Sequence, residues 1–297
     1  MKRLLRLSVL ALALTALACG GESDPAGTPI DTTTDGGTNT PQCAAESNRH
    51  TNVAPATLPT DSKRLIVFGD SISAGVGAPT GQAYFDLLTS AKASTDTSAN
   101  LATLYGHDVP VVNVAVGGAT TANLAGQVTN LKTRLPAPVA GHSIIVVTIG
   151  GNDLMRFTGI ATIEQKLRAF ITSLQDPAWF PDGTTILLAN VYDPSDGVGS
   201  APQCFNGFDA SSLTGQLPTW GEHYATLAKE LGVGIVDSLG HFRGHGFHYD
   251  DTSNQYYQST DATLWFANDC IHPNERGHSE LRRLFYEALD CKFLATP

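Results

Sequence analysis

Three residues of this sequence have the types and settings that nucleophilic catalysis requires. Ser71 ends the run Leu-Ile-Val-Phe-Gly-Asp-Ser, in which four apolar residues lead into a polar triplet. A serine hydroxyl is a weak nucleophile until a base removes its proton, and His272 is the candidate base. Asp269, three residues earlier, could accept the second imidazole N–H and stabilise the imidazolium. The three residues are therefore candidates for a catalytic triad that forms an acyl-enzyme at Ser71.

Each of these residues also has an ordinary structural interpretation. A serine after a strand often caps a helix, and an aspartate such as Asp269 often closes a turn. His272 stands directly before Pro273 and could pack at the start of a helix. The elements that surround the three residues decide between catalysis and these roles.

Strands and helices are predicted to alternate along the chain. Short apolar runs bounded by turn residues predict buried strands at residues 65–68, 109–116, 144–149, 185–191 and 234–237. Helical patterns are predicted at residues 82–90, 121–135, 160–174, 218–231 and 274–289. This alternation predicts an α/β domain whose central parallel sheet of about five strands carries helices on both faces.

Polar residues follow several of these strands. Ser71, Gly118 and Asn152 each lie within one to three residues of the end of a different predicted strand. Because right-handed crossovers place the carboxyl ends of parallel strands on one edge, we expect the three to converge there. Asp70 and Asp153 stand beside two of them, and we expect their carboxylates to bind loop backbone without a catalytic role.

Four short motifs occur in a fixed order along the chain. They are Gly69-Asp70-Ser71-Ile72, Asn113 with Gly118, Gly150-Gly151-Asn152-Asp153 and Asp269-Cys270-Ile271-His272-Pro273. Together they resemble the four motif blocks of the SGNH (GDSL) hydrolase family over about residues 63–291. Ile72 stands where that family has leucine, and Cys270 occupies a spacer position, so neither should alter the site. The resemblance implies a flavodoxin-like three-layer α/β/α sandwich and a serine esterase that needs no cofactor.

The resemblance also assigns an oxyanion hole. Its donors would be the backbone N–H groups of Ser71 and Gly118 and the side-chain amide of Asn152. A glycine at position 118 leaves space for a substrate to approach the backbone, and Gly117 is the competing choice. For Asn152, the alternative is an Asx turn after the preceding glycines.

A histidine-rich segment suggests a rival site. His241, His245 and His248 lie within residues 240–251, and imidazoles are common metal ligands. Because the glycines of this segment predict a loop, we expect no metal there and instead a loop beside the substrate. Aromatic residues of the same region would add aromatic surface or, alternatively, pack in the core: Tyr249, Tyr256, Tyr257, Trp265 and Phe266.

The chain begins with a segment typical of an export signal. Basic residues precede the apolar run 7–18, which is too short to span a bilayer and fits a signal peptide over residues 1–18. Small residues directly before Cys19 resemble a bacterial lipobox, although Ala16 stands where leucine is usual. We therefore expect a lipoprotein anchored through Cys19 in the cell envelope, with simple secretion as the alternative.

The remaining residues divide into a tether and one domain. Residues 19–60 have almost no large apolar side chains, which predicts a flexible tether, and residues 61–297 form the hydrolase domain. The chain has 18 Lys and Arg against 28 Asp and Glu, a net charge of −10, which argues against nucleic-acid partners. We expect a monomer that acts on a small-molecule or lipid ester.

The other cysteines predict disulfides, because the chain is expected to be exported. Four cysteines remain besides Cys19, and four allow three pairings. Cys204 and Cys270 both belong to loops expected at the edge of the sheet that carries the site, so we predict that they pair. Cys43 in the tether would then pair with Cys291 at the end of the last helix.

Three functions fit the sequence. The first is a serine esterase or lipase that cleaves acyl esters, and the second is a carbohydrate O-acetyl esterase with the same site. Aromatic residues near residues 241–266 would suit an acyl chain as well as a sugar, so both substrates stay open. The third is a non-catalytic surface-binding protein with the same fold, against which the complete set of serine, asparagine, aspartate and histidine argues.

Overall fold

A computed structural model describes residues 61–90, 100–200, 204 and 209–294, with side chains up to residue 289. The predicted signal peptide, the lipidation at Cys19, the tether and Cys43 lie outside these described residues. Within the described ranges, no helix combines the length and the apolar character that crossing a membrane would need.

A five-stranded parallel sheet forms the centre of the domain, with the strand order β2-β1-β3-β4-β5. The strands are β1 (Arg64–Gly69), β2 (Val111–Asn113), β3 (Ser143–Thr148), β4 (Thr184–Ala189) and β5 (Gly234–Val236). The predicted sheet is confirmed. Only β2 is much shorter than expected: Pro110, which has no N–H to donate, precedes it, and beyond Asn113, among the described residues, only the N–H groups of Val114 and Val116 still bond to the end of β1.

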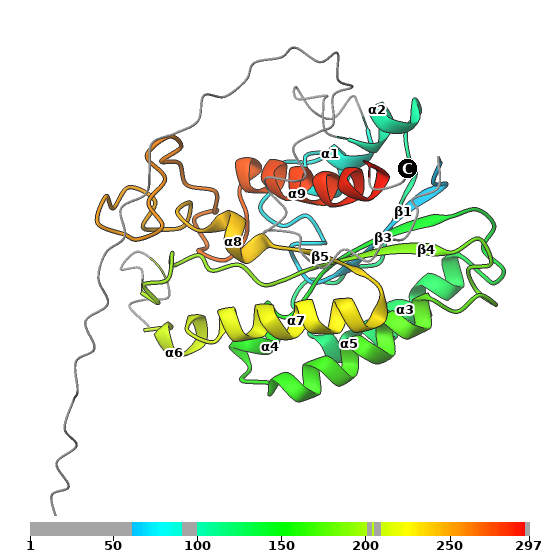
Figure 1. The fold of residues 1–297 in the computed structure, drawn as a ribbon, viewed down its shortest axis with the longest axis horizontal. Helices are drawn as coiled ribbons and strands as arrows, with labels where there is room; N and C mark the ends of the chain where they lie inside the picture. The colour runs from blue at the N-terminus through cyan, green and yellow to red at the C-terminus, as the bar shows by residue number, and fades with distance from the viewer. Residues whose placement is uncertain (1–60, 91–99, 201–203, 205–208, 295–297) are drawn as a thin grey trace, which may run out of the picture. The chain divides into compact units, whose positions relative to one another are not determined.

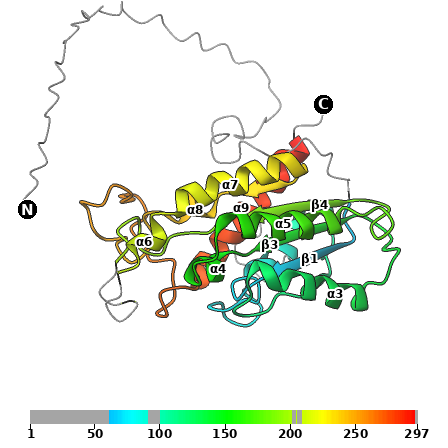
Figure 2. The same ribbon diagram turned by 90° about the horizontal axis from the view of Figure 1, so that it is seen from below.

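Helices cover both faces of this sheet (Figures 1 and 2). They are α1 (Tyr84–Thr89), α2 (Leu101–Tyr105), α3 (Leu124–Arg134), α4 (Gly151–Met155), α5 (Ile160–Leu174), α6 (Ser211–Thr214), α7 (Leu217–Leu231), α8 (Ser238–Phe242) and α9 (Glu275–Leu294), with a 3₁₀ turn, η2 (Thr121–Asn123). Helices α1 and α9 lie on one face, and α3, α5 and α7 on the other (Figure 1). The fold is therefore the predicted three-layer α/β/α sandwich.

Two apolar cores, one on each face, hold the sheet rigid. Side chains of a strand alternate between its faces. Ile66 and Phe68 of β1 join the core beneath α3, α5 and α7, whereas Leu65 and Val67 join the core beneath α1 and α9. Each of these side chains is fully buried, which contributes about 1.5–3 kcal/mol per residue. Burial on both faces explains why the strand sequence is continuously apolar and gives Ser71 a rigid support.

The strand order also creates a crevice. Strand β1 lies between β2 and β3 in the sheet. The chain passes from β1 to β2 on one side of β1 and then crosses over to β3 on its other side. Loops that follow β1 and β3 therefore diverge at the carboxyl edge of the sheet, where such folds bind ligands.

Candidate active site

A buried glutamine fixes the backbone directly before the candidate nucleophile. Gln127, on α3, accepts the N–H of Gly69 at 3.0 Å and donates its amide N–H to the Gly69 carbonyl at 2.6 Å. This pair of bonds anchors the last residue of β1 and so the position of Ser71. The sequence reasoning missed Gln127. One feature of the sequence could have pointed to Gln127. It stands three residues after the core residue Leu124, so both side chains lie on the face of the helix that is turned toward the sheet.

The loop after β1 is closed by its own hydrogen bonds. The Asp70 carboxylate accepts the N–H of Ile72 at 3.0 Å, which confirms the expected backbone-binding role. Burial raises the pKa of Asp70 to about 7, with a smaller rise from the charge of Asp153 and an opposing contribution from the Ile72 N–H. Asn113 donates its side-chain N–H to the carbonyl of Ser73 at 2.8 Å, which ties this loop to the end of β2.

Ser71, His272 and Asp269 form one chain of hydrogen bonds. The distance from Ser71 Oγ to His272 Nε2 is 2.7 Å, and from His272 Nδ1 to Asp269 Oδ2 it is 2.6 Å. Because ionised Asp269 can only accept, the imidazole Nδ1 carries the proton and Nε2 is left to accept the proton of Ser71. The structure thus brings together a nucleophile and a base that are 201 residues apart in the sequence.

The Asp269 carboxylate is held in its charged form. Partial burial alone would raise its pKa, but the backbone and side-chain N–H groups of His272 and the N–H of Ile271 outweigh burial. The net result is a pKa below the ordinary value. Its second oxygen, Oδ1, accepts the N–H of Ile271 at 3.1 Å and that of His272 at 3.0 Å. Asp269 therefore orients its own loop as well as the imidazole.

Three further contacts hold the loop that presents His272. Tyr192 donates its hydroxyl to the carbonyl of Ile271 at 2.8 Å, and the N–H of Ala267 donates to the carbonyl of His272 at 2.8 Å. Cys270 is joined to Cys204 by a disulfide with a Cα–Cα distance of 5.6 Å, the pairing that the sequence analysis predicted. The second predicted pair involves Cys43, outside the described residues.

Two of the predicted oxyanion donors, Gly118 and Asn152, belong to segments that are hydrogen-bonded to each other: the loop after β2 and the start of α4. Asn152, in the first turn of α4, donates one amide hydrogen to the carbonyl of Ala119 at 3.0 Å. Asp153 accepts the N–H and the hydroxyl of Thr121, both at 2.8 Å, which confirms its expected backbone-binding role and clamps the two loops together. Gly118 has a φ of +74°, a region that favours glycine. Position 118 therefore needs glycine for its backbone conformation.

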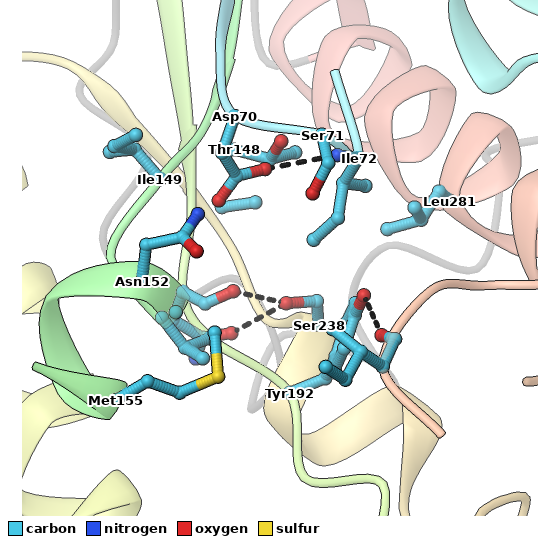
Figure 3. A pocket seen from close by; sticks show the side chains of 15 residues that line it. Asp70, Ser71, Ile72, Thr148, Ile149, Asn152, Met155, Tyr192, Ser238 and Leu281 are labelled. Carbon is cyan, nitrogen blue, oxygen red and sulfur yellow. Dashed lines mark hydrogen bonds between the residues drawn. The ribbon is translucent and has the colours of Figure 1, made fainter. Parts of the chain in front are cut away.

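An apolar hollow of about 60 Å³ opens beside the nucleophile (Figure 3). Ser71 and Asn152 lie at its upper edge, and the aliphatic side chains of Ile72, Ile149, Met155 and Leu281 surround it, with Tyr192 and Ser238 at the opposite side. Gly118 lines a separate, adjoining hollow. The apolar hollow could accept a hydrocarbon group attached to a carbonyl at Ser71.

The histidines of residues 240–251 do not converge. His241 Nε2 contacts Glu280 Oε2 at 3.0 Å, His245 stacks on Trp265 with 3.4 Å between ring centres, and His248 Nε2 bonds the carbonyl of Ser200. Among the residues that the structure describes, no cluster of histidine, cysteine, aspartate or glutamate could hold a metal ion.

For two of the aromatic residues in this segment, the alternative of core packing holds. Trp265 and Phe266 are buried in the core beneath α9 and so do not add aromatic surface, because α8 and α9 cover them. No residue of the range 240–266 lines the apolar hollow, so this hollow gives the predicted place of the segment beside the substrate no support. Instead the buried carboxylate of Asp196 accepts the N–H groups of Gly244 and Gly246 and pins the segment to the loop after β4.

A parallel α/β/α sandwich with serine, histidine and aspartate linked at its carboxyl edge is an architecture of serine hydrolases. The chain belongs to the GDSL-like Lipase/Acylhydrolase family, whose family model matches residues 67–279.

Individual proteins resemble this chain more distantly. The Esterase TesA of Pseudomonas aeruginosa is 30% identical over 135 residues, which are 45% of this chain and 56% of that protein. The chain thus spans about half the length of this curated relative. Phospholipase A1 from Streptomyces albidoflavus NA297 superimposes with a TM-score of 0.52 at 18% identity, over 78% of this chain and 100% of that one. An acetyl xylan esterase, AlAXEase, superimposes with a TM-score of 0.52 at 16% identity, over 76% and 99%. These two likenesses show a shared fold.

Proposed function

We propose that this protein is a serine ester hydrolase that cleaves carboxylic ester bonds through an acyl-enzyme at Ser71. The observation that supports it most is the 2.7 Å contact between Ser71 Oγ and His272 Nε2, with Asp269 on the opposite side of the imidazole. Membership of the lipase/acylhydrolase family supports the same reaction.

The reaction has two halves, and in each of them His272 accepts one proton and then donates it. His272 Nε2 takes the proton of Ser71 as Oγ bonds to the ester carbonyl carbon, and the imidazolium then gives that proton to the departing alcohol oxygen. In the second half a water molecule gives a proton to the same Nε2 and attacks the acyl carbon. The bond from that carbon to Ser71 Oγ then breaks, the imidazolium returns the proton to Oγ, and the acid is released. Asp269 keeps the proton on Nδ1 throughout and stabilises the imidazolium.

Three N–H donors support the proposal because each has a hydrogen that no other described group of the protein accepts. Within the described residues, neither the Ser71 N–H nor the Gly118 N–H donates to another group of the protein. The second amide hydrogen of Asn152 completes the set, since only one is used by Ala119. Donors that are free of protein partners can stabilise the negative charge that develops on the carbonyl oxygen.

Labelling with a fluorophosphonate, followed by peptide mapping of the full chain, tests the assignment. We expect one label per chain, on Ser71, and neither label nor ester hydrolysis in Ser71→Ala. Ser238→Ala is a matched control, because Ser238 lines the same hollow but donates its hydroxyl to the Asn190 carbonyl. The proposal would be contradicted if the Ser71→Ala variant were labelled at another residue or kept more than a few per cent of the wild-type activity.

We also propose that the domain is anchored to the cell envelope by acylation of Cys19. The lipobox-like sequence supports this, and several acyl chains would bind a membrane stably. Cys19→Ser should move the protein from the membrane fraction to the soluble fraction of the producing cells. Equal membrane retention of the variant and the wild type would refute the anchor.

A further inference from the structure

A second hollow of about 360 Å³ lies next to the active site, and we call it the polar groove. Its lining includes Val116, Gly118, Asn123, Gly126, Asn130 and Arg156. It is larger than the apolar hollow at Ser71 and has a different chemical character, because side-chain amides and a guanidinium line it. The reaction described above uses none of these side chains.

The polar groove adjoins the proposed oxyanion donors. Gly118 is part of its lining, and so is Ala119, whose carbonyl accepts the amide N–H of Asn152. Arg156 also lines the groove and donates from Nη2 to the carbonyl of Gly118 at 3.3 Å. An ester whose carbonyl oxygen meets these donors has two arms. The apolar hollow suits the acyl arm, which leaves the polar groove for the alcohol arm.

Groups that line the groove are matched to hydroxyl-bearing ligands. Asn123 and Asn130 lie seven residues apart, so they share one face of the helix. The Oδ1 of Asn123 accepts the N–H of Thr120, and the Oδ1 of Asn130 accepts from Arg134, which leaves their amide N–H groups as donors. No carboxylate lines the groove among the described residues. Arg156 already donates to the Gly118 carbonyl, and the remaining side-chain donors are uncharged amides, which match the oxygen atoms of hydroxyl groups.

A glycine keeps the groove open at a cost to its helix. Gly126 lies inside α3, where glycine is about 1 kcal/mol less favourable than alanine. Packing does not require it, since a Cβ at this position would meet no atom within 4 Å. Gly126 is exposed and lines the groove, so a larger side chain at this position would take up space at the groove. Occupation of the groove by a ligand explains a glycine that the fold does not need.

We propose that the polar groove binds the alcohol arm of the ester substrate, and that this alcohol is a neutral, hydroxyl-rich group such as a sugar. The assignment rests on the proposed function of Ser71. The bond that breaks joins the acyl carbon to a sugar oxygen, and that oxygen takes the proton from His272 and leaves through the groove. Asn123, Asn130 and Arg156 hold the other hydroxyl groups.

Two esters with the same acyl group test this assignment: 6-O-acetylglucose and ethyl acetate. The wild type should prefer the sugar ester in kcat/KM. Gly126→Leu, which fills the groove, should lower kcat/KM for the sugar ester at least ~10-fold while leaving ethyl acetate nearly unchanged. Its thermal midpoint should not fall, because leucine is a better helix former than glycine. Asn130→Ala should act in the same direction more weakly.

Thr129→Leu is the matched control, because Thr129 is exposed on the same helix and does not line the groove. It should leave the ratio of the two kcat/KM values unchanged. If Ser71 reacts with a fluorophosphonate but Gly126→Leu does not change the ratio, the groove assignment alone is wrong. An acetyl ester of glycerol phosphate serves as a third substrate. If Gly126→Leu lowers kcat/KM for this anionic ester only, the groove binds an anion and the proposal is also wrong. If Ser71 is not labelled and neither ester is cleaved, both proposals fail.

Discussion

Gly77 and His272 pack against each other at the active site although one follows β1 and the other precedes α9. A Cβ built on Gly77 would lie 3.2 Å from the Cβ of His272 and 2.1 Å from the carbonyl oxygen of Pro273. The φ of Gly77 is +96°, a value that residues other than glycine rarely adopt. The distance between nucleophile and base therefore depends on a position where no side chain fits.

This contact predicts that Gly77→Ala will separate Ser71 from His272. A displacement of about 1 Å between reacting groups can cost about 10²-fold in rate, and we expect a loss of that order in kcat. Gly81→Ala is the control, since Gly81 has a similar φ of +75° but a Cβ there would meet no atom within 4 Å. Ester hydrolysis and thermal midpoints of both variants would check this. Equal loss of activity in the two would show that backbone strain alone is responsible.

Asn152→Ala should lower kcat by about 10²–10³-fold, the usual effect of removing one oxyanion donor. KM should change much less, because the donor acts mainly on the charge that develops during the reaction. Steady-state kinetics with a soluble ester would measure both constants. A large increase in KM at unchanged kcat would instead assign Asn152 to substrate binding.

The site motifs could be predicted because most of them follow a strand closely and the last one directly precedes the final helix. At a strand end the local sequence determines both where the strand stops and which residue it presents, as for Ser71 and Asn152. The pairing of Cys204 with Cys270 could be inferred for the same reason, since both loops belong to one edge of the sheet.

What could not be predicted depends on packing between distant segments. Gln127 is a polar residue on a helix, and only the approach of α3 to β1 shows that it binds Gly69. The contact of Gly77 with His272 exists only once α9 has docked. Trp265 belongs to no helix or strand, and it is buried because side chains of α8 and α9 pack in the same core. No periodic pattern of residues encodes such contacts.

The Cys204–Cys270 disulfide should matter more for activity than for the presence of the fold. It links residues 66 apart, which corresponds to roughly 4 kcal/mol of loop-closure entropy. The double variant Cys204→Ser, Cys270→Ser should lose most of its ester hydrolysis at about 25 °C. At the same temperature its far-UV circular dichroism should stay that of a folded protein. Full activity in the double variant would show that hydrogen bonds alone position His272.

Stability in mild acid should depend on His278, a buried histidine of α9. Its Nε2–H donates to the carbonyl of Val76, its Nδ1 accepts the N–H of Tyr84, and burial lowers its pKa to about 4. The unfolded chain binds this proton near the ordinary pKa of about 6.5. Between these values the unfolded state holds more protons, so stability falls as the pH falls, by up to roughly 3 kcal/mol at pH 4.

Thermal midpoints of wild type and His278→Asn between pH 7 and pH 4.5 would measure this effect. The wild type should lose more stability than the variant across that range. Asp70, whose raised pKa has the opposite effect on stability, is present in both proteins and cancels in the comparison. Parallel pH profiles for the two proteins would contradict the assignment.

The order of the site residues along the chain has a consequence for biosynthesis. Ser71 follows the first strand to leave the ribosome, whereas His272 comes after all five strands and directly before α9. The nascent chain therefore carries the candidate nucleophile without its base until the 201 positions that separate them have been synthesised. Helix α9 then secures both partners, because His278 binds the loop that contains Val76. The geometry that the proposed reaction requires is therefore assembled only after α9 has been made and has packed against the sheet.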